Sequence, residues 1–284
     1  MPELPEGETV RRGLDKSLKG FCIEKVEVLS ERSIASNGGY KEFVNKLKGL
    51  VIGPWERRGK YLIASLHKNK SGNPSGWLVV HLRMTGHFQW IKEGKSPCSH
   101  TRVRFLDKRG YEIRFVDMRN FGQLWWLPVD RNPKEAIKGI KNLGPEPFSK
   151  EFSPAYLQKS LKNKKRSIKS ALLDQSIFAG TGNIYADESL FYAEINPLKK
   201  SGDLTKIELE KLCFSLIKVL KKSIGEGGTT FKDFRDIEGI NGNYGGQAWV
   251  YRRSKEPCKK CGTIIKKEKI AGRSSHWCPK CQKE

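Results

Sequence analysis

The chain has 284 residues, which is enough for two domains of ordinary size or for one domain plus a small module. Its net charge of +23 at pH 7 predicts a polyanionic partner, most simply nucleic acid, although a solvated lysine surface is the plain alternative. No stretch approaches the ~20 apolar residues of a membrane span, and the acidic, proline-containing start is unlike a secretory signal. We therefore expect a cytoplasmic protein.

The chain opens with Met-Pro-Glu-Leu-Pro-Glu, in which two prolines fix two φ angles beside two carboxylates. This opening is not typical of a helix start, so we expect a helix only over residues 7–19, where Val10, Leu14 and Leu18 share a face. Removal of the first residue would expose the secondary amine of Pro2, and an α-amino group has a pKa of about 7.7–8.0. An amine beside a carboxylate has the parts for Schiff-base chemistry; an ordinary frayed terminus is the other interpretation.

Short β-rich runs separated by turns follow, from about residue 23 to residue 127. In one of them the apolar residues Val103 and Phe105 share a face, and turn signals fall at residues 70–75 and 107–110. Many short strands predict a β-sandwich or barrel-like domain. The expected strands are residues 23–29, 61–66, 77–82, 88–91, 102–106, 112–116 and 123–127.

The periodicity becomes helical after a stiff connector at residues 143–147. A Gly-Thr-Gly-Asn stretch at residues 180–183 predicts a tight turn between two helices. A glycine-rich loop at residues 225–246 then precedes a small C-terminal module, and loops of this length are usually functional or disordered. The expected helices are residues 154–161, 168–173, 185–193 and 206–224.

Two Cys-x-x-Cys pairs in the C-terminal module, sixteen residues apart, predict one tetrahedral structural Zn²⁺ site. The span between the pairs reads as a β-hairpin with Ala-Gly-Arg at its turn, which would present Arg273 outward. Two alternatives to a DNA-binding zinc finger stay open. The finger could serve only to stabilise the fold, or the cysteines could form a redox-active pair. The expected zinc ligands are Cys258, Cys261, Cys278 and Cys281.

Segments spread over the whole chain resemble the bacterial formamidopyrimidine-DNA glycosylases (Fpg, or MutM), to which the endonuclease VIII enzymes are related. The Leu-Pro-Glu opening, the Met84 motif and the Arg119-x-Phe121 motif resemble Fpg more than endonuclease VIII. The similar segments are residues 2–6, 57–62, 81–86, 117–122, 143–147, 179–188, 227–230 and the zinc finger.

This resemblance implies an α+β multidomain fold. We expect residues 1–130 to form an N-terminal catalytic domain, a β-sandwich preceded by a helix. Residues 131–248 would form a helix-two-turn-helix DNA-binding domain. Within the latter, the loop at 225–246 would cap the damaged base. A four-cysteine zinc-finger β-hairpin at 249–284 would complete the chain.

The resemblance also implies a bifunctional base-excision repair enzyme, a DNA glycosylase and abasic-site lyase that acts as a monomer. Its substrate would be double-stranded DNA with oxidised purines, such as 8-oxoguanine and formamidopyrimidines, and it would cleave the abasic site by β- and δ-elimination. Pro2 would be the Schiff-base nucleophile on the sugar C1′, Glu3 its acid/base partner and Glu6 a supporting group. Lys60 and Arg273 would contact phosphate and serve the β- and δ-elimination steps.

Excision requires the damaged nucleotide to leave the stack, which costs a few kcal/mol, and something must fill the gap. Met84, Arg119 and Phe121 match the family's wedge, because two are apolar and the third can bind the estranged base. Core filling is the other interpretation of Met84 and Phe121.

Further contacts to the DNA backbone are expected from residues outside the wedge. Asn183 follows a glycine at a helix start, where backbone N–H groups bind phosphate. His100, Lys164 and Lys165 resemble additional phosphate contacts, with a solvated charge run as the alternative for the two lysines.

Three positions depart from the family pattern. Gly7 replaces a usual apolar residue next to the nucleophile, Asn120 replaces the second basic residue of the wedge motif, and Thr181 stands where an apolar residue is common. Two other functions stay open, a non-catalytic damage-binding protein on the same scaffold and an endonuclease VIII-like enzyme for oxidised pyrimidines.

Overall fold

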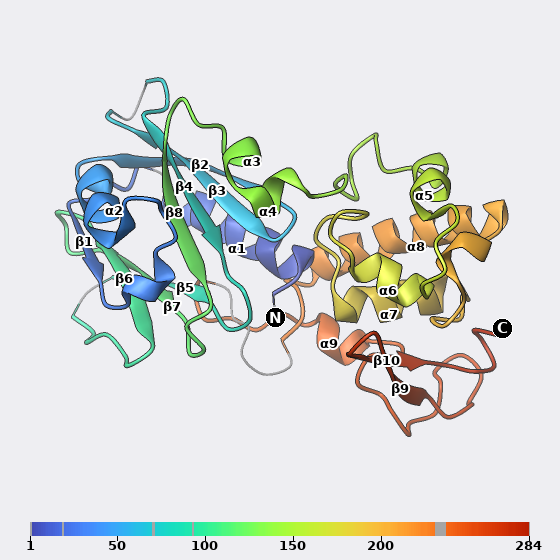
Figure 1. Ribbon diagram of the computed structural model, residues 1–284. Coiled ribbons are helices and arrows are strands. Elements are labelled where there is room, and N and C mark those ends of the chain that lie inside the picture. Colours follow the sequence, from blue (N-terminus) through green and yellow to red (C-terminus); the bar gives the residue numbers. More distant parts are fainter. Residues whose placement is uncertain (1, 19, 70–71, 93, 231–236, 284) are drawn as a thin grey trace. The chain divides into compact units, whose positions relative to one another are not determined.

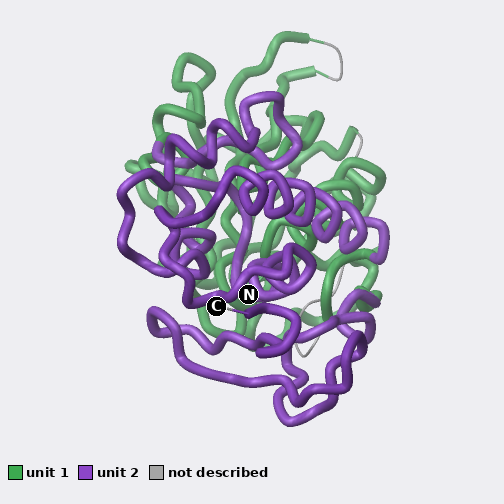
Figure 2. The backbone as a smooth tube through the Cα atoms, turned by 90° about the vertical axis from the view of Figure 1, so that its right-hand side faces the viewer, with its two compact units in different colours: residues 1–141, 227–242 green, residues 142–226, 243–284 purple. Residues whose placement is uncertain are grey.

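The computed structural model describes residues 2–283 except 19, 70–71, 93 and 231–236. The chain forms two compact units, residues 1–141 with 227–242 and residues 142–226 with 243–284 (Figure 2). Among the described residues, no helix has the length and apolar character needed to cross a membrane. The expected division into three domains, 1–130, 131–248 and 249–284, stays a prediction.

The first unit is built on two antiparallel four-stranded sheets, which confirms the predicted sandwich (Figure 1). Large apolar side chains fill its core, among them Leu62, Val80, Phe88, Phe105 and Phe115. One sheet has the order β2 (Val51–Arg58), β3 (Tyr61–His67), β4 (Gly76–His81), β8 (Gln123–Pro128); the other has the order β1 (Lys25–Val28), β6 (Thr101–Leu106), β7 (Glu112–Val116), β5 (His87–Ile91).

Seven of these strands match the expected runs, and β2 was missed. Gly53 and Pro54 lie in its middle and resemble a turn signal. The pairing of β2 with β3 shifts register between Ile52 and Trp55, so the proline sits at a bulge, where a missing N–H is tolerated.

Helix α1 covers Leu4–Ser17, so the prediction that the first six residues stand outside a helix was wrong. Proline in a first turn lacks only a donor that has no helical partner. Glu3 caps the helix in a reciprocal capping box with Glu6. The expected C-terminal residue, Lys19, lies outside the described residues.

The second unit contains four main helices and one hairpin, close to the expected bounds. They are α5 (Pro154–Leu161), α6 (Ile168–Leu173), α7 (Asn183–Tyr192), α8 (Lys206–Gly225) and the strands β9 (Lys266–Ile270) and β10 (Arg273–Trp277). Side-chain oxygens of Ser153, Ser167 and Thr205 cap α5, α6 and α8.

Shorter elements complete both units. They are η1 (Glu31–Ser33), α2 (Gly39–Leu47), α3 (Pro133–Ala136), α4 (Lys138–Lys141), η2 (Ser201–Asp203) and α9 (Tyr244–Gln247). Helix α2 was missed because it starts at the last residue of a Ser-Asn-Gly-Gly stretch that reads as a loop.

Candidate functional site

The start of α1 buries two carboxylates directly behind Pro2. Pro2 is itself buried, and Glu3 and Glu6 are 3% and 1% exposed. The Glu3 backbone N–H donates to Oε2 of Glu6 at 2.8 Å, and the Thr229 N–H donates to its other oxygen at 2.8 Å. The capping box therefore fixes both carboxylates next to Pro2.

The Thr229 contact requires a close approach of two chain segments that are far apart in sequence. Gly228 has φ +83°, and a Cβ added there would lie 3.0 Å from Oε1 of Glu6. Only glycine adopts that conformation without strain and leaves the carboxylate in place. The Gly-Gly-Thr stretch is thus part of the carboxylate site.

Lys60 lies in the turn between β2 and β3, after Gly59 at φ 57°, and is half-buried. Burial, together with the charges of Arg83 and Lys60, lowers the pKa of His81 to about 3. Nδ1 of the neutral His81 ring accepts the Arg83 N–H at 3.0 Å. His81 therefore orders the turn that leads into Met84.

The three wedge candidates lie together in the first unit. Met84 and Phe121 are 37% and 39% exposed, which excludes core filling for both. The Arg119 guanidinium lies 4.8 Å from the centre of the Phe121 ring, and its Nη1 lies 2.8 Å from the Met84 sulfur. Two loops thus present two apolar side chains with one guanidinium between them.

Asp117 holds these two loops together and was missed by the sequence reasoning. It is fully buried and accepts the N–H groups of Phe121 at 2.8 Å and Gly122 at 2.6 Å, and also the Thr85 hydroxyl. Its own N–H donates to the His100 carbonyl at 2.9 Å, which ties His100 to the wedge loop. It also accepts the Arg119 N–H at 3.2 Å, and an aspartate two residues before such a donor is the Asx-turn pattern that the sequence offered as a signal.

In the second unit, the α7 N-terminus is tied to the zinc hairpin. Nδ2 of Asn183 donates to the Ser274 carbonyl at 2.8 Å. The fully buried Lys169 donates to the Asn183 carbonyl at 3.0 Å and to Asp187, which accepts the His276 N–H at 3.0 Å. Sequence reasoning missed both Lys169 and Asp187, because nothing local marks a buried lysine as paired.

Other basic candidates of this unit are at its surface. Arg273 is exposed at the first position of β10, next to the turn, as the hairpin prediction expected. Lys164 and Lys165 are exposed in the segment before α6. The Lys164 carbonyl accepts the Gly202 N–H at 3.0 Å, which fixes the backbone but leaves the side chain at the surface.

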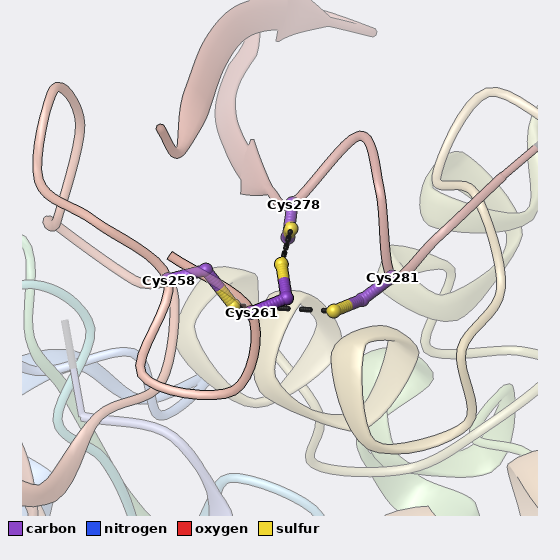
Figure 3. Close-up of side chains that lie close together, drawn as sticks. All are labelled: Cys258, Cys261, Cys278 and Cys281. Atoms are coloured by element: carbon purple, nitrogen blue, oxygen red, sulfur yellow. Dashed lines mark hydrogen bonds between the residues drawn. The ribbon is translucent and has the colours of Figure 1, made fainter. Parts of the chain in front are cut away.

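The four predicted zinc ligands converge (Figure 3). Their sulfur atoms all lie within 4.8 Å of one another, with 3.4 Å between Cys261 and Cys278 and 4.0 Å between Cys258 and Cys281. A tetrahedral Zn²⁺ with Zn–S bonds of about 2.3 Å requires S–S separations of about this size. The donor set therefore fits a structural zinc ion with no open coordination position.

Glu188 of α7 attaches the zinc module to the helical part of its unit. This fully buried carboxylate accepts the N–H groups of Trp249, Val250 and Tyr251, each at 2.9 Å. Phe191 of α7 packs with Val250, Ile265 and the buried cysteines. The zinc module is too small to form a hydrophobic core by itself, and Phe191 of α7 completes one for it.

Comparisons with known proteins agree with this architecture along the chain. Residues 1–124 match the formamidopyrimidine-DNA glycosylase N-terminal domain, residues 143–235 its H2TH domain and residues 255–283 the zinc finger found in FPG and IleRS. A formamidopyrimidine-DNA glycosylase of Prochlorococcus marinus strain MIT 9211 is 67% identical over 99% of this chain and 100% of its own length. One from Parasynechococcus marenigrum is 60% identical, with the same coverage.

Solved structures give the same result at lower identity. Lactococcus lactis Fpg bound to DNA with an abasic site has a TM-score of 0.90 and 32% identity, over 99% of this chain and 100% of that one. A mutant of the same protein bound to Fapy-dG DNA has a TM-score of 0.90, with complete coverage of both chains. The chain belongs to the formamidopyrimidine-DNA glycosylase family of DNA-repair enzymes.

Proposed function

We propose that this enzyme flips oxidised purines, such as 8-oxoguanine and formamidopyrimidines, out of double-stranded DNA, excises them and cleaves the abasic site by β- and δ-elimination. The relatives named above share its whole length, and the L. lactis protein was crystallised on Fapy-dG and abasic-site DNA. The observation that carries the proposal is the buried pair Glu3 and Glu6 directly behind Pro2.

The Pro2 amine, once Met1 is removed, attacks C1′ of the damaged nucleotide, and the bond from C1′ to the base breaks. The amine nitrogen then loses its proton, the bond from C1′ to the ring oxygen O4′ breaks, and the iminium formed on Pro2 activates the opened sugar for elimination. Glu3 exchanges protons with the opening sugar ring, and Glu6 holds Glu3 through its backbone N–H. Met1 itself lies outside the described residues.

Lys60 serves β-elimination as proton donor and contacts phosphate, and Arg273 contacts phosphate and serves δ-elimination. Met84 and Phe121 fill the space of the flipped base, while Arg119 binds the base left without a partner. Asn183, His100, Lys164 and Lys165 contact the backbone. The loop at 225–246 caps the flipped base; its residues 231–236 lie outside the described residues.

The bound Zn²⁺ supplies folding energy to the hairpin and no reaction chemistry, since four thiolates fill its coordination shell. Cys258, Cys261, Cys278 and Cys281 hold it. We place the enzyme in the bacterial cytoplasm with the nucleoid, acting as a monomer.

Glu3→Gln tests the proposed chemistry, because it removes proton transfer but little volume. Single-turnover excision from a duplex with 8-oxoguanine opposite cytosine should fall at least ~100-fold, while lesion binding stays near wild type. Glu8→Gln is the matched control on the same helix, since Glu8 pairs with Arg11 and Arg57, and should keep excision.

Wild-type excision by the Glu3→Gln variant would overturn the role of Glu3. The same assay with a duplex that contains an oxidised pyrimidine distinguishes the proposed purine enzyme from the endonuclease VIII-like alternative. This second substrate is needed because L. lactis Fpg has itself been crystallised on DNA with an oxidised pyrimidine. Faster release of the pyrimidine would contradict the proposed substrate class.

A further inference from the structure

Asn120, the uncharged residue in the wedge motif, bonds to a neighbouring loop. It adopts φ 55°, a left-handed conformation that asparagine tolerates better than most residues. Its Oδ1 accepts the hydroxyls of Ser30 at 3.1 Å and Ser33 at 3.0 Å, and its Nδ2 donates to Ser30 at 2.9 Å. Ser33 is fully buried, so this contact is anchored in the first unit.

Arg32, one of the two residues between those serines, lies on η1 and faces Phe121. Its guanidinium lies 5.4 Å from the centre of the Phe121 ring, while that of Arg119 lies 4.8 Å from the same centre. A surface depression of about 420 Å³ is lined by Arg32, Arg83, Met84, Asn120, Phe121 and Gln123. Arg32 thus brings a positive charge to Phe121 although position 120 is neutral.

Three guanidiniums, those of Arg32, Arg83 and Arg119, surround the two exposed apolar side chains. Among the residues that the structure describes, no carboxylate forms an ion pair with any of them. Like charges gathered around one depression repel each other, and an anion between them relieves the repulsion. A guanidinium also presents paired N–H donors that match phosphate oxygens.

We propose that Arg32 binds a DNA backbone phosphate beside the base step that Phe121 enters, and that Asn120 positions it there. The charge that the wedge motif lacks at position 120 is supplied from η1. This inference rests on the proposed wedge, and it adds a phosphate-binding residue and a positioning residue to it.

The test is a salt titration of binding to a duplex that carries a non-cleavable abasic-site analogue. Each neutralised phosphate contributes about −0.9 to the log–log slope, so Arg32→Ala should flatten it by about one. Arg109→Ala is the matched control, an exposed arginine of the same unit that also lies over a ring, 4.9 Å from the Tyr111 centre. It should leave the slope unchanged.

A rescue variant and a coupling measurement complete the test. Arg32→Ala/Asn120→Arg should recover the lost slope, and Arg83 at φ 54° shows that this surface accommodates an arginine in that conformation. Asn120→Gly, which keeps the positive φ without strain, should weaken binding in the wild type but not in the Arg32→Ala background.

An Arg32→Ala slope equal to that of wild type and Arg109→Ala would overturn the phosphate contact. Additive effects of Asn120→Gly and Arg32→Ala would overturn the positioning role. Loss of excision by the wild type would instead count against the proposed function, because the binding slope does not depend on catalysis.

Discussion

At the residue scale, the departures from the family pattern are of different kinds. Gly7 lies inside α1, and a Cβ there would meet only Cδ of Arg57 at 3.6 Å, so nothing in the fold requires glycine. Thr181 is fully buried, and its hydroxyl has no hydrogen-bond partner among the described residues, which is why an apolar side chain suits that position. Of these three described residues, only Asn120 makes side-chain hydrogen bonds.

Gly7→Ala should therefore stabilise the protein by about 0.5–1 kcal/mol, because alanine lowers the entropy of the unfolded chain and fits the helix. Gly228→Ala should have the opposite effect and lower the free energy of unfolding by at least ~1 kcal/mol. The φ of +83° at Gly228 and the nearby Glu6 oxygen both disfavour a Cβ there. Denaturant unfolding of both variants measures the difference. Destabilisation by Gly7→Ala would show that the helix start needs the freedom of glycine.

At the element scale, α7 organises the second unit. Four residues of this helix contact the C-terminal module or its hairpin: Asn183, Asp187, Glu188 and Phe191. The helix itself was predictable from its apolar content and the glycine before it, but these contacts were not. The hydrogen bonds among them join residues 61 to 91 positions apart, and no local pattern in the sequence records such pairs.

Loss of zinc should therefore disorder the hairpin and also leave the carboxylates of Asp187 and Glu188 without their N–H donors. Cys278→Ser should lose the metal, lower the thermal unfolding temperature and abolish lesion binding. Cys22→Ser, a cysteine of the first unit outside the cluster, should keep one zinc and normal binding.

Arg273→Ala separates folding from recognition in the same hairpin. We expect it to keep its zinc and its unfolding temperature while binding DNA more weakly, since an exposed guanidinium serves phosphate rather than packing. Metal analysis and DNA-binding measurements on the same variant show whether zinc and binding are lost together or separately. Normal lesion binding by the zinc-free Cys278→Ser protein would mean that the finger only stabilises the fold and does not recognise DNA.

At the scale of the whole molecule, the chain passes through the first unit twice. Residues 227–242 return to it, where Ile237 is buried in the sandwich core and its carbonyl accepts the Trp90 N–H at 3.1 Å. The strand and helix periods predicted the sandwich and the helices, and the cysteine spacing predicted the metal cluster. The return passage was not predictable, because its contacts depend on a glycine-rich segment without periodicity.

The central claim is that the amine of Pro2 performs the chemistry. Borohydride reduction of the enzyme during its reaction with a duplex containing 8-oxoguanine opposite cytosine, followed by peptide mapping, tests it most directly. We predict a covalent complex whose modified residue is an N-terminal Pro2. A crosslink to a lysine such as Lys60, or full strand cleavage without any trapped complex, would contradict the account.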